Sequence, residues 1–183
     1  MRVGVYGGSF NPPHVGHAMV AAWLGWTRRV DEVWLVPTLR HAFDKPLAPF
    51  PERLAACRAL AEVVGPFVRV DTIEGELSAP SFTIETLRAL ARRSPHAQLH
   101  LVIGADLLPQ LPQWREAETL LATWPLLVVG REGSPPVVDA PCFPGVSSTE
   151  VRARLRAGED VQHLVPAAVL DVVRRWPTAW LGG

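Results

Sequence analysis

Cysteine, charge of one sign and long apolar runs are all scarce in this sequence of 183 residues. Two cysteines, Cys57 and Cys142, are too few and too far apart for a disulfide framework or a four-cysteine zinc site. Eighteen basic and eighteen acidic side chains cancel, so no overall field draws the protein to nucleic acid or to an anionic membrane. No apolar stretch approaches the ~20 residues that span a bilayer, and no signal peptide is visible. We therefore expect a cytoplasmic protein that acts on small molecules, with no nucleic-acid or membrane partner.

What is present is ordinary for a globular protein. Hydrophobic residues make up 48% and charged residues 20% of the chain, which is long enough to bury a substantial core. We expect one domain over residues 1–183, with a C-terminal helical part from about residue 146 packed on the sheet. The sequence leaves the oligomeric state open.

Short apolar runs alternate with helical patterns along the chain. Strands are expected at residues 2–6, 32–37, 67–71, 98–104 and 126–129. Helices are expected at residues 15–29, 51–64, 81–93, 114–122, 147–157 and 167–176. The alternation predicts an α/β fold: a doubly wound, mainly parallel sheet with helices on both faces. Ligands of such folds lie at the carboxyl ends of strands where the strand order reverses, which singles out residues 7–17 and 104–114.

The 7–17 segment reads Gly-Gly-Ser-Phe-Asn-Pro-Pro-His-Val-Gly-His. Its paired glycines let the backbone turn sharply and approach a ligand, and the helix that follows offers free N–H groups to phosphate. His14 and His17 are three residues apart, so they share a face of the first helical turn, and Gly16 leaves room beside them. Two imidazoles there can stabilise charge that develops on phosphate oxygens.

Other interpretations of this segment exist. The histidines could be a satisfied surface pair, or they could bind zinc with His41 or Asp106 as a third ligand. A dinucleotide fingerprint is disfavoured because the turn lacks Gly-x-Gly-x-x-Gly, and the Gly-Lys-Ser/Thr ending of a P-loop is absent too.

The same segment resembles the Gly-x-Phe-x-Pro-x-His-x-Gly-His signature of the nucleotidyltransferase superfamily of adenylyl- and cytidylyltransferases, with every fixed position matched. Residues 147–152, Ser-Ser-Thr-Glu-Val-Arg, resemble its second signature, Ser-Ser-Thr-x-x-Arg. The resemblance implies a Rossmann-like nucleotidyltransferase fold with catalytic roles for His14, His17 and Arg152. It also implies ATP contacts from Gly7, Gly8, Ser9, Phe10, Gly16, Gly104, Asp106, Ser147, Ser148 and Thr149.

The second signature has a physical interpretation of its own. A helix N-terminus with hydroxyl groups and an arginine is a favourable place for an anion. Alternatively, Ser147 and Glu150 only cap the helix as a capping box, and Arg152 lies on a solvated face.

Two middle segments, residues 81–87 and 104–114, are similar to parts of bacterial nicotinate mononucleotide adenylyltransferases. That resemblance implies that Thr83 and Trp114 flank a pyridine ring and that Gly104 and Asp106 approach nucleotide sugar or base. An indole that stacks on a flat ring and a carboxylate that accepts ribose hydroxyls suit these roles. The alternatives are that Trp114 only packs and that Asp106 is the N-cap of the next helix.

The resemblance is weakest between residues 37 and 51. Many relatives have a Pro-His-Lys-like stretch there that helps to bind phosphate. Here His41 and Lys45 could fill those places on the mononucleotide side, although their spacing departs from the pattern, and a plain surface loop is the alternative.

The family resemblance implies transfer of AMP from ATP to nicotinate mononucleotide or nicotinamide mononucleotide, which gives the dinucleotide and pyrophosphate in NAD biosynthesis. Mg²⁺ is implied with ATP, held mainly by phosphate oxygens and water, since no cluster of acidic residues suggests a protein metal cage. The rival hypotheses are another adenylyl- or cytidylyltransferase of the superfamily, such as a phosphopantetheine adenylyltransferase, and a non-catalytic nucleotide-binding module.

Overall fold

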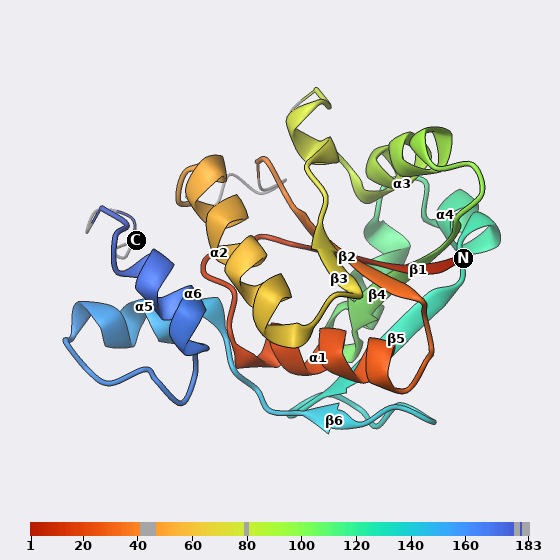
Figure 1. Cartoon of the computed structure of the whole chain (residues 1–183). Coiled ribbons are helices and arrows are strands. Elements are labelled where there is room, and N and C mark those ends of the chain that lie inside the picture. The colour runs from red at the N-terminus through yellow and green to blue at the C-terminus, as the bar shows by residue number, and fades with distance from the viewer. Residues whose placement is uncertain (41–46, 79–80, 178–179, 181–183) are drawn as a thin grey trace.

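The fold is a six-stranded parallel sheet in the order β3-β2-β1-β4-β5-β6, seen in a computed structural model that describes residues 1–40, 47–78, 81–177 and 180 (Figure 1). Its strands are β1 (Arg2–Gly8), β2 (Glu32–Pro37), β3 (Val68–Val70), β4 (Gln98–Gly104), β5 (Leu126–Arg131) and β6 (Cys142–Phe143). Its α-helices are α1 (Val15–Trp26), α2 (Phe50–Val64), α3 (Thr83–Arg93), α4 (Ala117–Thr123), α5 (Ser148–Arg156) and α6 (Ala167–Val173). Two 3₁₀ helices, η1 (Ile73–Gly75) and η2 (Ala105–Gln113), complete the described chain.

The strand order reverses between β1 and β4. The chain proceeds from β1 outward through β2 to β3, returns to pair β4 with the other side of β1, and then continues outward to β6. The segments that leave β1 and β4 therefore lie next to each other at the carboxyl edge of the sheet. This confirms the predicted doubly wound fold and the predicted place of its crevice.

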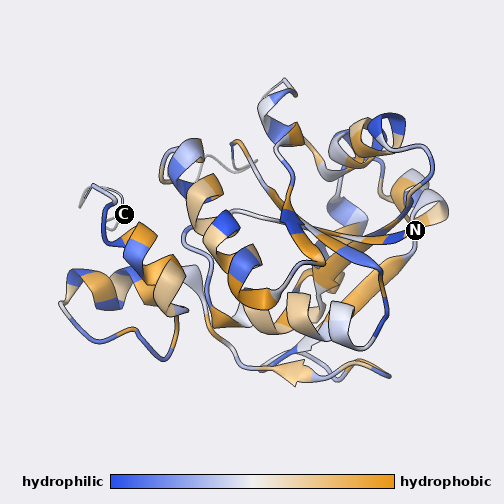
Figure 2. Cartoon of the chain, viewed as in Figure 1, coloured by the Kyte–Doolittle hydropathy of each residue, from blue (hydrophilic) through white to orange (hydrophobic). Residues whose placement is uncertain are grey.

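Alternate strand residues supply two cores, one on each face of the sheet. In β2, Val33 and Leu35 belong to the core under α1 and α2, whereas Trp34 and Val36 belong to the core under α3. Both cores need apolar side chains, so the strands are mostly hydrophobic, with scattered hydrophilic positions (Figure 2). Burial on both faces of the sheet is therefore why the sequence contains near-continuous apolar runs.

The C-terminal helix α6 packs mainly against α2 rather than over the strands (Figure 1). Val169 and Val173 of α6 and Val151 of α5 are fully buried in the same core as Leu60 of α2. This core is continuous with that of the sheet, and the arrangement sets α5 beside the segment that leaves β1. That the whole chain acts as one domain stays a prediction.

The structure differs from the sequence prediction at several element ends. β1 continues through both glycines of the 7–17 segment, and α1 ends at Trp26, before the left-handed Arg28 (φ 55°). A nine-residue 3₁₀ helix with two prolines, η2, precedes α4, which begins at Ala117 rather than at residue 114. Prolines remove N–H donors from the helix ladder, so this stretch favours the shorter-range 3₁₀ pattern.

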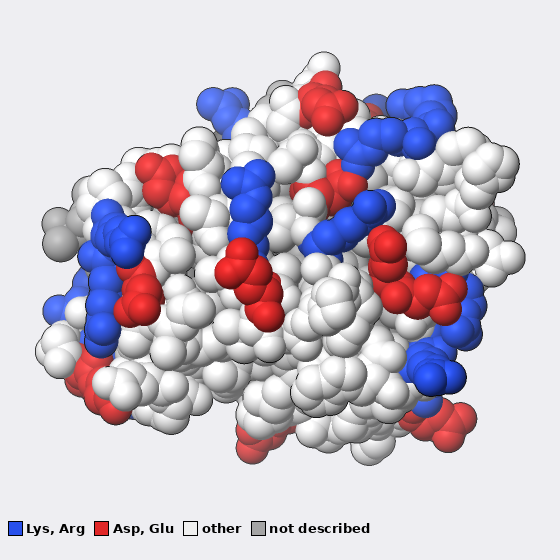
Figure 3. All heavy atoms as spheres, in the orientation of Figure 1, with Lys and Arg blue, Asp and Glu red and all other residues white. Residues whose placement is uncertain are grey.

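Charges of both signs are interspersed over the face shown in Figure 3, as the balanced composition leads one to expect. Within the described ranges, no helix is both long and apolar enough to cross a membrane.

Candidate active site

The two histidines of the 7–17 segment lie against each other at the carboxyl end of β1. The His14 and His17 ring centroids are 3.8 Å apart, and the His17 ring lies 4.8 Å from that of Phe10. Phe10 is 1% exposed and adopts a positive φ of 45°, which turns the chain out of the strand and directs the phenyl ring under the histidine. The segment thus places an aromatic ring beside His17, at an interplanar angle of 52°.

A hydrogen bond fixes the orientation of His17. The backbone N–H of His14 donates to His17 Nδ1 over 3.2 Å, so Nδ1 acts as an acceptor. A neutral His17 therefore carries its proton on Nε2, which remains a donor. The side-chain Nδ1 of His14 is buried without a hydrogen-bond partner among the described residues, so it can accept or donate one bond to a bound molecule.

Gly16 is required by the His14 ring. A Cβ built at Gly16 would lie 3.0 Å from both Cε1 and Nδ1 of His14, tighter than most real Cβ contacts, so the ring would have to move. The glycine between the histidines therefore gives the imidazole the space that the sequence analysis predicted.

Both histidines are neutral near pH 7 in the free protein. Burial, aided by the nearby charge of Arg131, lowers the pKa of His14 to about 4. Burial is the main cause that lowers the pKa of His17 well below its ordinary value, and the charges of His14 and Arg131 lower it further. Two neutral imidazoles can donate hydrogen bonds to phosphate without first repelling each other as cations.

The second predicted anion segment docks onto the first. Ser148 Oγ donates to the carbonyl of Pro12 over 2.8 Å, and Arg152 Nη1 donates to the carbonyl of Asn11 over 2.6 Å. Arg152 is 6% exposed, so the predicted alternative of a solvated face is wrong for it. The structure thus brings together His14, His17 and Arg152, the three residues predicted to be catalytic, from opposite ends of the chain.

Ser147 has the capping role that the sequence suggested. Its Oγ accepts the N–H of Glu150 over 3.1 Å at the N-terminus of α5. Glu150 itself pairs with Arg154 one turn further on, and Thr149 is exposed.

Arg131, at the end of β5, is a site residue that the sequence analysis missed. Its guanidinium donates to Asp106 Oδ2 over 3.2 Å and to the carbonyl of Val146 over 2.8 Å, just before α5. It is also close enough to lower the pKa values of both histidines. A lone arginine after an apolar strand gives no signal in a sequence, because its partners come from distant segments.

Asp106 does not cap the next helix, contrary to one predicted alternative. The N-cap of η2 is Gly104, and the carboxylate of Asp106 pairs instead with Arg131. A Cβ on Gly104 would lie 2.2 Å from Asp106 Oδ1, so this glycine makes room for the carboxylate.

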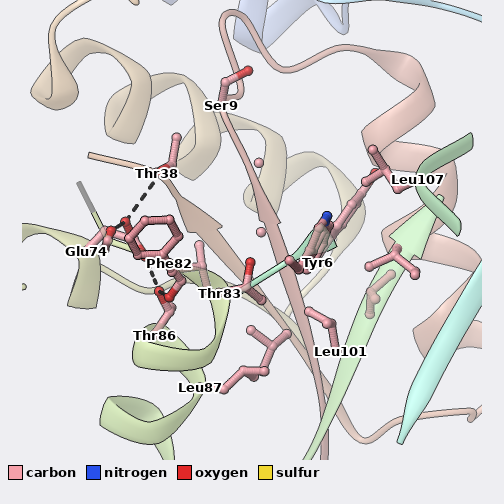
Figure 4. A pocket seen from close by; sticks show the side chains of 18 of the residues that line it. Tyr6, Ser9, Thr38, Glu74, Phe82, Thr83, Thr86, Leu87, Leu101 and Leu107 are labelled. Carbon is pink, nitrogen blue, oxygen red and sulfur yellow. Dashed lines mark hydrogen bonds between the residues drawn. The ribbon is translucent and has the colours of Figure 1, made fainter. Parts of the chain in front are cut away.

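A cavity of about 590 Å³ opens at the carboxyl ends of β1 and β4, beside the histidines (Figure 4). Thr83 and Trp114, the residues predicted to flank a pyridine ring, both line it, as do Gly7, Gly8, Ser9 and Gly104. Tyr6 lines the cavity and lies 5.9 Å from the His17 ring, which links the cavity to the histidine pair. Apolar side chains such as Leu87 and Leu101 form much of the remaining wall.

One wall of the cavity is held by Glu74, which the sequence analysis also missed. Its carboxylate accepts hydrogen bonds from the hydroxyls of Ser81 and Thr86, and from the hydroxyl of Thr38 and the N–H of Leu39 at 3.4 Å each. Figure 4 shows Glu74, Thr38 and Thr86 gathered on one side of the cavity, with Leu107 on the other. Since the donors occupy the carboxylate, Glu74 positions the wall.

Arg53 of α2 performs a similar task beneath the 7–17 segment. It is 1% exposed and donates to the carbonyls of Ser9, Thr38, Leu39 and Ala48 over 2.7–3.2 Å. Burial lowers its pKa to about 10, which leaves it charged. The arginine therefore holds the strand ends of β1 and β2 in register.

His41 and Lys45 lie outside the described residues. Within the part of the chain that is described, no three histidine, cysteine or acidic side chains lie close enough to hold a metal ion, so the predicted zinc alternative finds no support there.

Comparisons with known proteins agree on one family. The sequence matches the family model described as cytidylyltransferase-like over residues 5–154. It is 47% identical over 175 residues to a probable nicotinate-nucleotide adenylyltransferase of Anaeromyxobacter dehalogenans (strain 2CP-1), with 94% of this chain and 93% of that protein covered. A relative of the same description from Myxococcus xanthus is 38% identical over 175 residues, with 95% and 92% covered.

A solved structure has the same fold. Plasmodium falciparum nicotinic acid mononucleotide adenylyltransferase, complexed with NaAD, superimposes with a TM-score of 0.77 at 18% identity and covers 95% of each chain.

Proposed function

This chain belongs to the nicotinate-nucleotide adenylyltransferases, and on that premise we propose that the histidine pair and the adjoining cavity form one crevice for its two substrates. The enzyme transfers AMP from ATP to nicotinate mononucleotide and releases pyrophosphate. The triphosphate of ATP lies against His14, His17 and the N-terminus of α5. The mononucleotide lies in the 590 Å³ cavity.

The observation that carries this proposal is the convergence of two anion-binding segments on one edge of a mostly apolar cavity. Ser148 and Arg152 bond directly to the backbone of the 7–17 segment, and Tyr6 lies between that segment and the cavity. Phosphates need donors and positive charge, whereas a pyridine ring needs an apolar slot and a flat partner. Both kinds of surface meet here at the predicted point of the sheet.

The reaction needs positioning more than covalent chemistry. An oxygen of the mononucleotide phosphate forms a bond to the α-phosphorus of ATP, and the bond from that phosphorus to the bridging oxygen of pyrophosphate breaks. Negative charge increases on the oxygens of the leaving pyrophosphate. Hydrogen-bond donors at these oxygens accelerate the step if they bind the transition state more strongly than the substrate.

His17 Nε2 and His14 supply such donors. The anionic triphosphate favours protonated imidazoles, so its arrival raises their pKa values from the depressed values of the free enzyme. Each histidine can then donate to a phosphate oxygen as charge builds up. Arg152 has no carboxylate within 4.0 Å among the described residues, so its charge is available to the triphosphate.

Arg131 and Asp106 complete the ATP side. The guanidinium of Arg131 adds positive charge near the histidines, and the Asp106 carboxylate lies where a ribose hydroxyl could donate to it. Gly7 leaves the backbone open, since a Cβ there would meet nothing within 4 Å, whereas a Cβ on Gly8 would contact the Phe10 ring at 3.4 Å.

A divalent cation, Mg²⁺, enters with ATP as part of the substrate. The described residues contain no dedicated ligand cluster, and Mg²⁺ at phosphates commonly keeps water and phosphate oxygens as its ligands. It supplies charge neutralisation at the triphosphate. A role of His41 and Lys45 in binding the mononucleotide stays a prediction, as does a cytoplasmic location.

The test is a pyrophosphate-release assay of the purified protein with ATP, Mg²⁺ and either nicotinate or nicotinamide mononucleotide. We expect pyrophosphate and the dinucleotide in equal amounts, with the nicotinate substrate preferred. Release of pyrophosphate with 4′-phosphopantetheine in place of the mononucleotide, or with CTP in place of ATP, would favour a different member of the superfamily.

A further inference from the structure

Arg115 supplies the positive charge at the cavity rim, and we propose that it determines the preference of the site for nicotinate mononucleotide over nicotinamide mononucleotide. The inference rests on the proposed function above, because it assumes that the cavity holds the mononucleotide. Nicotinate and nicotinamide have nearly the same shape, and Arg115 lies outside both sequence signatures of the superfamily.

The Arg115 guanidinium is held in place from two directions. Its central carbon lies 4.8 Å from the centroid of the Phe82 ring, and Nη1 lies 3.2 Å from Glu85 Oε1. The other carboxylate oxygen of Glu85 accepts the N–H of Phe82 over 3.1 Å. Stacking and an ion pair therefore fix the plane of the cation against the start of α3.

This position is next to the proposed pyridine slot. Arg115 follows Trp114 directly in the chain, and Phe82 directly precedes Thr83. All four residues line the cavity. Thr83 and Trp114, which we propose to flank the pyridine ring, are therefore each next to one member of the Phe82–Arg115 pair. A substituent on a ring bound there would lie close to the guanidinium.

Among the described residues that line the cavity, Arg115 is the only one with a positive charge. The other charged residue among the described lining residues is Glu74, whose oxygens already accept four hydrogen bonds. A guanidinium has five N–H donors, and the contact with Glu85 involves one Nη atom. Arg115 therefore has donors left for an acceptor in the cavity.

The two mononucleotides differ in the group that such donors would meet. Both rings carry a positive charge on the pyridinium nitrogen, but nicotinate also carries a carboxylate, which nicotinamide replaces with a neutral amide. Beside Arg115, the carboxylate gains a charge-assisted hydrogen bond. The amide ring instead brings an uncompensated cation towards the guanidinium, so the same residue attracts one substrate and repels the other.

The experiment compares kcat/KM for the two mononucleotides in wild-type enzyme and in Arg115→Gln, at saturating ATP and Mg²⁺. We expect the ratio of nicotinate to nicotinamide kcat/KM to fall about tenfold, as for one charge-assisted bond at a side chain that is 52% exposed. The change should lie in KM for nicotinate mononucleotide, with kcat within about threefold of wild type, because Arg115 acts on the ring and not on the reacting phosphates. Arg115→Lys should keep much of the ratio, since it keeps the charge.

Removal of Arg115 also frees the Glu85 carboxylate, which could repel nicotinate by itself. The double variant Glu85→Gln with Arg115→Gln removes both charges, and its amide can still accept the N–H of Phe82. We expect it to show the same fall in the ratio, and Glu85→Gln alone to keep or raise it. Arg92→Gln, which removes one exposed charge from α3 away from this cavity, is the matched control and should leave the ratio unchanged.

A double variant with the wild-type ratio, or with equal losses for both mononucleotides, would overturn the assignment of Arg115. So would a Glu85→Gln variant that lowers the ratio as much as Arg115→Gln does. Failure of the proposed function is a separate outcome, because wild-type enzyme would then release no pyrophosphate with either mononucleotide.

Discussion

At the scale of single residues, the histidine pair is the feature on which the proposed chemistry depends most. The His17 ring lies against the rings of Phe10 and His14, and its Nδ1 is occupied by a backbone N–H, so Nε2 is the atom left for phosphate. The tertiary structure thereby assigns different tasks to two residues that the sequence could only treat as a pair.

We expect His17→Ala to lower kcat by roughly 10²-fold, the scale of losing one transition-state donor. Steady-state pyrophosphate release measures this, with circular dichroism to verify folding. His96→Ala, at an exposed histidine, is the control and should retain full activity. Near-normal turnover in a folded His17→Ala enzyme would refute the role of this imidazole.

Gly16→Ala offers a sharper test of the same geometry. The added methyl would lie 3.0 Å from the His14 ring and displace it, so kcat should fall at least about tenfold. Helical alanine is more favourable than glycine by about 1 kcal/mol, so the thermal midpoint should not drop greatly. In a His14→Ala background the substitution should cost little further activity. An equal additional loss there would show that Gly16 acts independently of His14.

At the scale of elements, the catalytic segment is held by neighbours rather than by its own turns. Arg53 of α2 bonds four backbone carbonyls in the segments that follow β1 and β2. Ser148 and Arg152 of α5 bond two more carbonyls further along the same segment. Rigid positioning of this kind suits a reaction that relies on geometry.

Arg53→Met should destabilise the fold by about 3 kcal/mol or more, because one buried and three partly buried carbonyls lose their donor. Urea unfolding monitored by tryptophan fluorescence measures the loss. Arg58→Met on the same helix removes an exposed arginine and should change stability by less than about 0.5 kcal/mol. Similar stability of both variants would mean that Arg53 does not hold these segments.

At the scale of the whole molecule, burial of the histidine pair links stability to pH. The pKa of His14 is lowered to about 4, and that of His17 is also lowered, relative to about 6.5 in the unfolded chain. Between these values the unfolded chain binds more protons, so stability rises with pH and is lost as pH falls from about 6.5 towards 4.

For His14 alone, the loss at the acid end approaches about 3 kcal/mol. Urea midpoints measured from pH 4 to pH 7.5 should therefore fall less steeply on the acid side in His14→Gln than in wild type. The exposed His163→Gln serves as the control and should keep the wild-type slope. Identical slopes in all three proteins would contradict the buried, neutral state of His14.

Much of this molecule was predictable because its signals are local. Apolar runs predicted all five of the longer strands. The 7–17 segment, with its glycines and spaced histidines, predicts a phosphate site, and that assignment stays a prediction. The two-residue strand β6 was missed, since Cys142 and Phe143 carry no periodic pattern of their own. The 3₁₀ helix η2 was also missed, because no element was expected between residues 104 and 114, where two prolines interrupt the chain.

The sequence by itself determined the fold class and the family, and it indicated the 7–17 segment that we propose as catalytic, since each depends on residues that are close together in the chain. Only the tertiary structure decided which distant side chains complete the site. Arg131, Glu74, Arg53 and Arg115 each contact a group that lies 25 to 44 residues away in the chain, through contacts that no sequence spacing encodes. Burial, which also results from tertiary packing, decided that the two histidines rest uncharged.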